Sequence, residues 1–472
     1  MNDIKINSTT GKEIILPASM VEDFKSKLLG TLLQSGDSGY DEARALWNGM
    51  IDKRPSLIAR CAGTADVISC VNFARENNLS VCVKSGGHNI AGTASSNGSL
   101  MIDLSRMNGV RVDPKSKMAW VGPGATLRVV DHETQAFGLA VPLGINSTTG
   151  ISGLTLGGGF GWTSRSLGLT IDNLVSADVV TVGGKLLRAS KKDNPDLFWG
   201  ICGGGGNFGI VTSFQFKLHP VGPVVLGGLI VHPFKDAAKV FKYYRDFVAK
   251  ASDKLTCWVV LRKAPPLPFL PADVHGKEIF IIALLYNGDM KKGEKEVEAL
   301  RKFGRPIADV IGPMPFVAFQ QMFDPLLTPG ARNYWKSHNF SKLQDEAIDT
   351  IVDYAGKLPT PFTEIFVGQL AGAINRVKKN ATAYPHRDTN FVMNVHTRWE
   401  DKNSDDQCIQ WARNFFDVSA KYANGSVYVN FISEGERLTA SAFGTNFKKL
   451  AKLKKKYDPQ NFFRVNQNIK PA

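Results

Sequence analysis

The stretch Lys84-Ser85-Gly86-Gly87-His88-Asn89-Ile90-Ala91-Gly92 comes directly after residues 80–84, which are predicted to form a strand. Three glycines and a small serine allow the backbone of such a loop to approach a ligand closely and to donate N–H groups to a diphosphate. The imidazole of His88 would stand at the tip of this loop. A histidine in a loop is more often exposed or hydrogen-bonded than reactive, so the motif alone leaves both interpretations open.

Two more glycine-rich stretches follow along the chain. Residues 150–162 read GISGLTLGGGFGW, which suits either close backbone approach to a phosphate or a tight packing corner between strands. Residues 204–209 match the G-x-G-x-x-G pattern of dinucleotide sites, which requires a helix directly afterwards. Residues 210–216 alternate like a strand instead, so a Rossmann site is excluded. Together the three loops suggest one large cofactor that carries phosphate.

The flanking sequence predicts an α+β region. Residues 56–61 and 80–84 are expected to form strands on either side of an amphipathic helix over 64–77, with Thr64 as its N-cap. This βαβ unit is followed by shorter predicted strands joined by glycine-rich turns, at residues 101–104, 118–121, 177–182 and 210–218.

A domain boundary is expected at His219-Pro220-Val221-Gly222-Pro223, because prolines and glycine end the preceding strand. A sheet with helices over one face should follow. Its strands are predicted at residues 224–231, 256–261, 279–286, 362–370, 390–399 and 426–431, and its helices at 291–303, 341–357 and 405–422.

Composition places the chain among globular proteins and leaves its partners open. Its 472 residues, 43% hydrophobic and 21% charged, predict two or three domains and exclude disorder and small disulfide scaffolds. The net charge of +14 permits nucleic-acid binding, but there is no recognition-helix, RNP or zinc-finger pattern. The densest basic run, at residues 448–456, is read as a solvated helix face.

The expected compartment is the cytoplasm. No signal peptide or membrane-spanning stretch is visible, and the six cysteines include no C-x-x-C pair, so they are compatible with free thiols in a reducing environment. No metal site and no membrane partner are predicted.

The order of the motifs resembles flavoproteins of the vanillyl-alcohol oxidase and p-cresol methylhydroxylase superfamily. The motifs are SGGH (85–88), VGPG (121–124), residues 150–162, GLTIDN (168–173), NPDLFW (194–199) and residues 204–211. The end of the chain resembles the berberine bridge enzyme branch through YVNF (428–431), YDP (457–459) and NQNI (466–469). The resemblance implies FAD bound by a two-subdomain α+β domain at residues 1–219. It also implies a substrate domain at 220–431, with an antiparallel sheet covered by helices, and a segment at 432–472 that returns to the first domain.

The same resemblance implies which residues hold FAD. In such enzymes the histidine of the G-G-H loop is commonly bonded to the flavin, and here it is His88. Asn146 stands where many relatives place a second linking cysteine, so a single covalent link is expected. The expected cofactor-binding residues are Lys84, Ser85, Gly86, Gly87, His88, Asn89, Gly92, Gly122, Pro123, Gly124, Gly144, Asn146, Thr149, Gly150, Ser152, Gly153, Gly158, Gly159, Asn173, Ile210, Asn466 and Asn468.

The catalytic base departs from the family pattern. Several relatives carry a tyrosine at the position of Phe431, which has no proton to exchange. The alternatives are His396, Tyr428 and Tyr334. In the predicted strand at 390–399, His396 shares one face with Asn394 and Arg398, and that face could either point into the cavity or be solvent-exposed. The two tyrosines could simply pack.

The predicted function is an FAD-dependent oxidase that transfers hydride from a small alcohol, amine or sugar-like substrate to flavin N5, with reoxidation by dioxygen. A dehydrogenase with another acceptor and a basic nucleic-acid-binding protein are the alternatives. The oligomeric state and the substrate have no readable signal.

Overall fold

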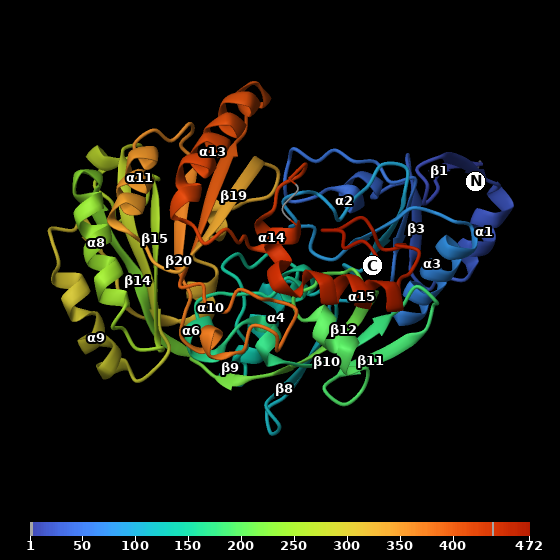
Figure 1. Ribbon diagram of the computed structural model, residues 1–472, viewed down its shortest axis with the longest axis horizontal. Helices are drawn as coiled ribbons and strands as arrows, with labels where there is room; N and C mark the ends of the chain where they lie inside the picture. Colours follow the sequence, from blue (N-terminus) through green and yellow to red (C-terminus); the bar gives the residue numbers. More distant parts are fainter. Residues whose placement is uncertain (1–2, 437–438) are drawn as a thin grey trace.

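The computed structural model describes residues 3–436 and 439–472, and its chain forms three main sheets (Figure 1). The N-terminal sheet has the strand order β3 (Thr31–Gln34), β4 (Leu57–Arg60), β6 (Leu100–Asp103) and β5 (Val81–Lys84). Both β4 and β5 pair in parallel with β6, so the predicted βαβ unit exists with β6 inserted between its two strands. Nearby lie β1 (Ile4–Asn7), β2 (Glu13–Leu16), α1 (Ala18–Ser26) and α2 (Tyr40–Arg44).

Helix α3 (Thr64–Glu76) joins β4 to β5 and buries Val67, Cys70, Val71 and Ala74 at helical spacing. Thr64 is its first helical residue and not its N-cap, so that prediction is wrong; the N-cap is Gly63, which has no side chain to cap with. In the first turn, the carboxylate of Asp66 reaches back and accepts the backbone N–H of Ala62, which precedes the N-cap, at 2.8 Å.

The second sheet is antiparallel, with the order β11 (Leu186–Ser190), β10 (Leu174–Val180), β12 (Ile210–Lys217), β8 (Met118–Val121) and β7 (Val110–Asp113). Strand β12 begins directly after the glycine run 204–209, which confirms that this motif does not open a Rossmann helix. The short elements around this sheet are α4 (Leu127–Gln135), β9 (Leu139–Ala140), α5 (Ile151–Leu156), α6 (Ser164–Leu167), α7 (Pro195–Ile201) and β13 (His219–Pro220).

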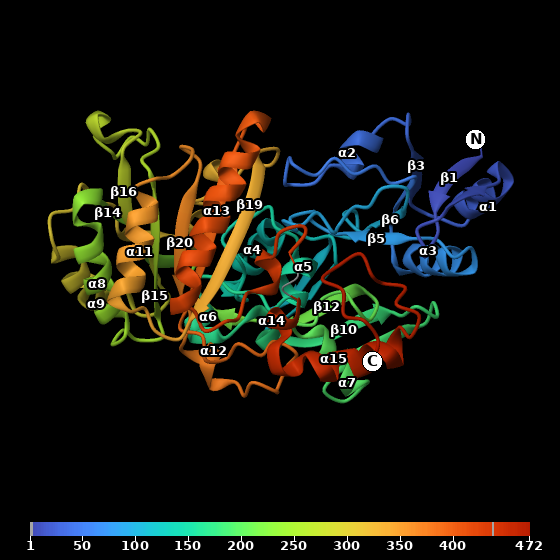
Figure 2. The ribbon, with the colours of Figure 1, turned by 45° about the horizontal axis from the view of Figure 1, so that its top comes forward.

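The third sheet contains eight strands. Its order is β17 (Ala308–Asp309), β14 (Val224–Pro233), β16 (Glu278–Tyr286), β15 (Leu255–Lys263), β20 (Glu364–Gln369), β21 (Phe391–Trp399) and β19 (Arg332–Phe340), with β18 (Gly312–Pro315) also on β14. Helices α8 (Ala237–Val248), α9 (Met290–Lys302), α11 (Asp345–Ala355) and α13 (Asp405–Ser419) cover one face of it (Figure 2).

Alternation along the strands separates the two faces of this sheet. In β21, Met393 and Val395 pack under the helices, whereas Asn394 and His396 point to the opposite face. That opposite face joins the core of the second sheet. The face that carries His396 is therefore buried and not solvent-exposed.

The predicted strand at residues 426–431 is wrong. Residues Val429–Phe431 form a 3-10 turn, because Tyr428 and Asn430 hydrogen-bond the loop at 154–159 instead of pairing with a sheet. The chain then forms α14 (Thr439–Phe443) and α15 (Phe447–Tyr457), which packs on α7. Between β18 and β21 lie the short helices α10 (Phe316–Gln320) and α12 (Ala373–Arg376). Further 3-10 turns are Thr170–Asn173, Phe234–Asp236, Ala272–Val274, Asp324–Leu326, Lys402–Ser404, Ala420–Tyr422 and Gly444–Asn446.

Within the described residues, no helix is both long enough and apolar enough to span a bilayer.

Candidate functional site

A cavity of about 320 Å³ lies where the glycine-rich loops, the C-terminal segment and the third sheet meet. Residues within 85–89, 144–157 and 205–211 form one side of it, together with Phe463, Val465, Asn466 and Gln467. Strands β15, β19, β20 and β21 contribute the other side through Trp258, Trp335, Phe366 and His396. Among the described residues that line the cavity, none is Asp, Glu, Lys or Arg. The cavity is therefore built from backbone, apolar rings and neutral polar groups.

The loops fit a large ligand that is held by backbone groups. Gly86 and Gly150 touch backbone to backbone, since a Cβ on Gly86 would lie 2.4 Å from the nitrogen of Gly150. Gly153 and Gly206 line the cavity, and a Cβ on either would enter open space. Glycine at these two positions therefore leaves the backbone uncovered and open to close approach by a ligand. Asn466 adds a buried amide oxygen that has no partner among the described residues.

His88 sits at the end of the cavity nearest Trp47, and the two rings stack at 5.0 Å. Its Nε2 lies 2.7 Å from the hydroxyl of Thr148, which itself donates to Oδ1 of Asn146 at 2.6 Å. An amide oxygen only accepts hydrogen bonds, so the Thr148 hydroxyl donates its proton to Oδ1 of Asn146. The same hydroxyl therefore accepts a hydrogen bond from Nε2–H of His88. Burial lowers the pKa of His88 to about 3, which keeps the imidazole neutral. Nδ1 of His88 then carries a lone pair, and the hydroxyl of Thr149 lies 3.5 Å from it.

Asn146 makes three hydrogen bonds in this arrangement. Its Oδ1 also accepts the backbone N–H of Thr148 at 3.0 Å, and its amide donates to the carbonyl of Leu327 at 3.0 Å. The residue thus fixes the loop beside His88.

The structure brings many of the predicted cofactor-binding residues to the cavity wall. These are Ser85, Gly86, Gly87, His88, Asn89, Gly144, Asn146, Thr149, Gly150, Ser152, Gly153, Ile210 and Asn466. Their binding of the cofactor stays a prediction.

The remaining predicted residues lie behind the wall: Lys84, Gly92, Gly122, Pro123, Gly124, Gly158, Gly159, Asn173 and Asn468. Several support the loops. The carbonyl of Pro123 accepts hydrogen bonds from both Ser85 and Ser152 at 2.6 Å. Lys84 donates to the carbonyl of Ala43, and Asn173 donates to that of Leu169. They hold the wall in place without facing the cavity.

Four residues form a row across neighbouring strands on the cavity face. The register pairs Arg262 with Glu364, Glu364 with His396, and His396 with Trp335. Nδ1 of His396 lies 3.1 Å from Oε1 of Glu364, and Arg262 binds the other carboxylate oxygen at 2.8 Å. Burial alone would raise the pKa of Glu364, but Arg262 and the hydrogen bond with His396 hold that pKa below its ordinary value. His396 is therefore hydrogen-bonded through Nδ1 to an ionised carboxylate.

The two candidate tyrosines differ from His396 in their surroundings. Tyr428 lines the cavity, but its hydroxyl oxygen accepts two hydrogen bonds, from the backbone of Gly159 and the amide of Asn430, both at 3.0 Å. Burial raises the pKa of Tyr428 to about 12. Tyr334 is not brought to the cavity at all, because it precedes Trp335 on β19 and so points to the helix-covered face. There it donates to Glu436 at 2.5 Å.

Sequence reasoning missed much of the cavity. Trp258, Trp335, Phe366 and Asn430 line it, yet none was singled out as a site residue. Strand alternation separates Trp335 from Tyr334, but it does not say which strands lie side by side. Among the described residues, no cluster of three or more metal-ligating side chains is present.

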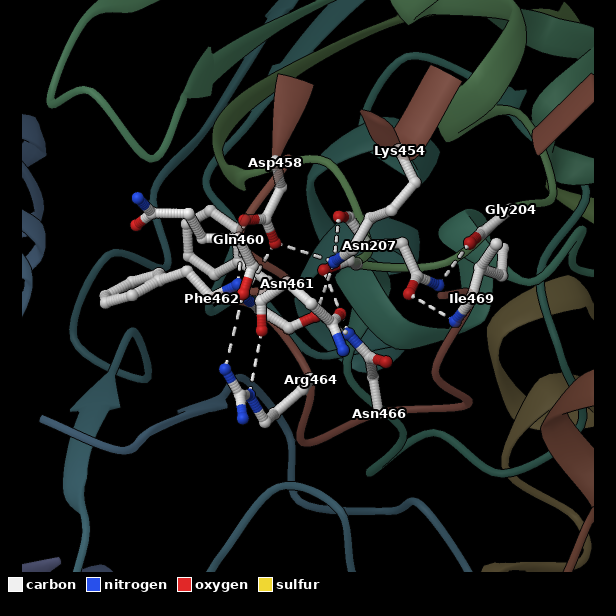
Figure 3. Close-up of polar contacts among 12 residues, drawn as sticks. Gly204, Asn207, Lys454, Asp458, Gln460, Asn461, Phe462, Arg464, Asn466 and Ile469 are labelled. Atoms are coloured by element: carbon white, nitrogen blue, oxygen red, sulfur yellow. Dashed lines mark hydrogen bonds and ion pairs between the residues drawn. The ribbon is translucent and has the colours of Figure 1, made fainter. Parts of the chain in front are cut away.

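The C-terminal segment is fastened to the cavity by a buried ion pair (Figure 3). The ammonium group of Lys454, which is fully buried, binds Asp458 at 2.7 Å and the carbonyls of Asn207 and Phe463 at 2.8 Å each. Asp458 also accepts the backbone N–H groups of residues 462 and 463. The prediction of a solvated basic face on this helix is therefore wrong at Lys454, where three buried acceptors satisfy the charge.

Comparisons with known proteins match this architecture. A family model described as FAD binding domain covers residues 55–190, and one described as berberine and berberine like covers 427–470. An FAD-linked oxidoreductase of Dictyostelium discoideum is 31% identical, over 96% of this chain and 97% of its own. A carbohydrate oxidase of Microdochium nivale is 28% identical, over 93% and 92%.

Among solved structures, 6-hydroxy-D-nicotine oxidase from Arthrobacter nicotinovorans superimposes with a TM-score of 0.85 and 26% identity, covering 94% of this chain and 98% of that one. This similarity confirms the predicted α+β fold class.

Proposed function

Since the chain belongs to the berberine bridge enzyme-like family of FAD-linked oxidoreductases, we propose that it is an oxidase in which His396 is the catalytic base. Its substrate would be a small alcohol, amine or sugar-like molecule. The observation that carries this proposal is the row Arg262, Glu364 and His396 on the cavity face. Of the three candidate bases, His396 alone both lines the cavity and keeps an acceptor atom that has no hydrogen-bond partner within the described part of the chain.

The loops at residues 85–89 and 144–153, together with Asn207 and Asn466, would hold FAD. Bound FAD supplies a two-electron acceptor for hydride. The neutral imidazole of His88 supports a single covalent link, because its Nδ1 carries a lone pair while the Asn146 amide has no nucleophilic atom.

In this proposal the protein accepts one proton from the substrate, and Glu364 fixes the orientation of the imidazole that accepts it. Nδ1–H of His396 donates to Glu364, which leaves Nε2 as the acceptor that faces the cavity. Nε2 accepts the hydroxyl or amine proton of the substrate, and Glu364 stabilises the resulting imidazolium. Arg262 keeps Glu364 ionised. Phe431 contributes a ring contact and no proton.

Dioxygen is proposed as the final electron acceptor. A dehydrogenase that uses another acceptor would share the same site. We also propose a cytoplasmic location, with which the six buried free cysteines are compatible.

Anaerobic mixing of the purified holoprotein with alcohols, amines and sugars tests the reaction. A true substrate should bleach the flavin band near roughly 450 nm, and admission of air should restore it, with hydrogen peroxide as product. Turnover that persists in flavin-free protein would contradict the proposal, and recovery only with an added dye would assign a dehydrogenase.

A further inference from the structure

Six rings line one part of the cavity and contact one another in a closed circuit, here called the aromatic cage: Phe160, Trp258, Trp335, Phe366, His396 and Phe431. The centroid distances around the circuit are 4.4 Å (Trp335–His396), 6.3 Å (His396–Phe366), 4.9 Å (Phe366–Trp258), 6.1 Å (Trp258–Phe160), 5.9 Å (Phe160–Phe431) and 5.7 Å (Phe431–Trp335).

The cage is assembled from distant parts of the chain. Four of its rings come from β15, β20, β21 and β19, which lie side by side in that order in the third sheet. Phe160 comes from the loop after α5, and Phe431 comes from the C-terminal 3-10 turn. The cage therefore lies mainly on the sheet side of the cavity, and Phe160 joins it from the glycine-rich stretch 150–162.

Few polar groups lie beside this cage. The ring of Tyr428 lies 5.0 Å from Phe160 and 4.8 Å from Phe431, and its hydroxyl oxygen already accepts hydrogen bonds from Gly159 and Asn430. Nε2 of His396 has no partner among the described residues, and the indole N–H of Trp335 is buried without one. The indole N–H of Trp258 is already used, since it donates to the carbonyl of Gln369 at 3.1 Å. A sugar would bury several hydroxyl groups here without partners, and each such group costs free energy. A flat ring, in contrast, finds stacking and edge contacts on every side.

The surrounding charges disfavour a cationic occupant. The nearest carboxylate, Glu364, is already bound by Arg262 and by His396. Arg398 is also buried, lies over the Trp47 ring at 5.3 Å and has one guanidinium nitrogen without a partner among the described residues. An ammonium group would thus meet an excess of positive charge with no anion free to pair with it.

We propose that the aromatic cage binds a flat, uncharged aromatic substrate whose hydroxyl or amine group faces His396. This narrows the substrate class of the proposed oxidase and rests on that function, because it takes the cage for the substrate part of the cavity.

Calorimetric titration of the FAD-loaded protein with a matched set of probes tests the cage. Benzyl alcohol and cyclohexylmethanol carry the same hydroxymethyl group and differ in the flatness of the ring, and glucose is the polar probe. We expect benzyl alcohol to bind at least about tenfold more tightly than cyclohexylmethanol, because aromatic contacts add to area burial, and glucose to show no binding.

Two variants connect this preference to the cage. Trp335→Leu should abolish the difference between the two ring probes, and Phe366→Leu provides a second test if the first variant folds poorly. Trp120→Leu is the matched control, because Trp120 lies on β8 outside the cavity and stacks on Arg111. Retained flavin and circular dichroism verify that each variant is folded.

The outcomes separate the failure of this proposal from the failure of the oxidase function. Equal affinities for the ring probes, tighter binding of glucose, or an unchanged preference in folded cage variants would overturn the aromatic-substrate proposal. If benzyl alcohol is preferred but no alcohol, amine or sugar reduces the flavin, the cage stands and the oxidase function fails. Flavin reduction by glucose, with no preference between ring probes, would support the oxidase function and overturn the aromatic-substrate proposal.

Discussion

His396 and Tyr428 line the same cavity, and their hydrogen bonds assign them different work. The oxygen of Tyr428 accepts from Gly159 and Asn430, so its lone pairs serve the fold of the loop at residues 157–161. His396 also lines the cavity; it places one ring nitrogen against a buried carboxylate, and its other ring nitrogen has no partner among the described residues. A base needs an acceptor atom within reach of the substrate proton, which only the second arrangement provides.

Replacement of the two side chains should separate these roles. His396→Ala should lower the rate of anaerobic flavin reduction by roughly 100-fold, the usual scale for loss of a general base. Tyr428→Phe should change that rate much less and should instead lower the free energy of unfolding by about 1 kcal/mol, through loss of hydrogen bonds to the loop. Stopped-flow absorbance and denaturant titration measure the two effects. The opposite pattern would reassign the base to Tyr428.

Glu364→Gln tests whether the carboxylate acts through His396. Without the negative charge the imidazolium is less stable, so the pH midpoint of flavin reduction should move to lower pH. Arg262→Gln, made in the wild-type protein, serves as a comparison. It keeps the carboxylate of Glu364 and removes only its guanidinium partner. A fall in rate with an unmoved midpoint would mean that Glu364 only supports packing.

The proposed single covalent link depends on two residues: His88, which would form it, and Asn146, which stands where many relatives have a second linking cysteine. Acid precipitation of the wild type should leave flavin on the protein, and mass spectrometry should find it on the peptide that contains residues 85–92. His88→Ala should still fold and bind FAD, since the loop backbone is unchanged, but acid should release this FAD. Flavin that stays attached in His88→Ala, or that leaves the acid-treated wild type, would refute the assignment.

Helix α15 shows how an element can look exposed in sequence and be anchored in the fold. Its lysines alternate with apolar residues, which predicts a solvated stripe, yet Lys454 turns inward to Asp458 and the backbone of the cavity loop. Both Asn207 and Phe463, whose carbonyls Lys454 binds, line the cavity. The ion pair therefore couples the C-terminal segment to the proposed cofactor site.

Lys454→Met should lower the free energy of unfolding by about 3–5 kcal/mol, because it leaves the buried Asp458 charge without its partner. The variant should also lose FAD more readily if its covalent link is removed by His88→Ala. Lys455→Ala, which changes an exposed lysine on the same helix, is the control and should stay within about 0.5 kcal/mol of wild type. Equal stability of the two lysine variants would show that the pair does not anchor the segment.

The sequence predicts local elements well where a short-range signal exists. Glycines at 86–87 identify the loop that carries His88, and alternation identifies β12 and β21. Residues 151–156, which were expected in a glycine-rich loop, form the short helix α5 instead. Alternation also produced the wrong strand at 426–431, since Tyr428 and Asn430 face a loop that is distant in sequence. The row Arg262, Glu364 and His396 depends on strand order and register across three separate segments, which no local pattern encodes.

The molecule as a whole closes around the cavity through contacts between its first half and the third-sheet region. One such contact joins α4 to α10, where Gln320 donates to Asp131 at 3.1 Å. Asp131 is buried, and its other carboxylate oxygen has no partner among the described residues. Burial raises the pKa of Asp131 to about 7, against an ordinary value of 3.8. The folded protein thus holds a proton at this contact that the unfolded chain would release.

This raised pKa makes stability fall as the pH rises. Between about pH 4 and pH 7 the folded state binds one more proton here than the unfolded state, so the free energy of unfolding should decrease by up to ~1.4 kcal/mol per pH unit from this group. Asp131→Asn carries no charge at any pH and still accepts from Gln320. The melting temperature of the variant should be closest to that of the wild type near pH 4, and the difference in favour of the variant should grow between about pH 4 and pH 7 and stay level up to pH 8. Scanning calorimetry of both proteins across this range measures the gap. A gap of constant size would show that the folded and unfolded states bind protons equally at Asp131, so that its pKa is not raised, and a less stable variant at pH 8 would show that its carboxylate is favourably paired at this contact.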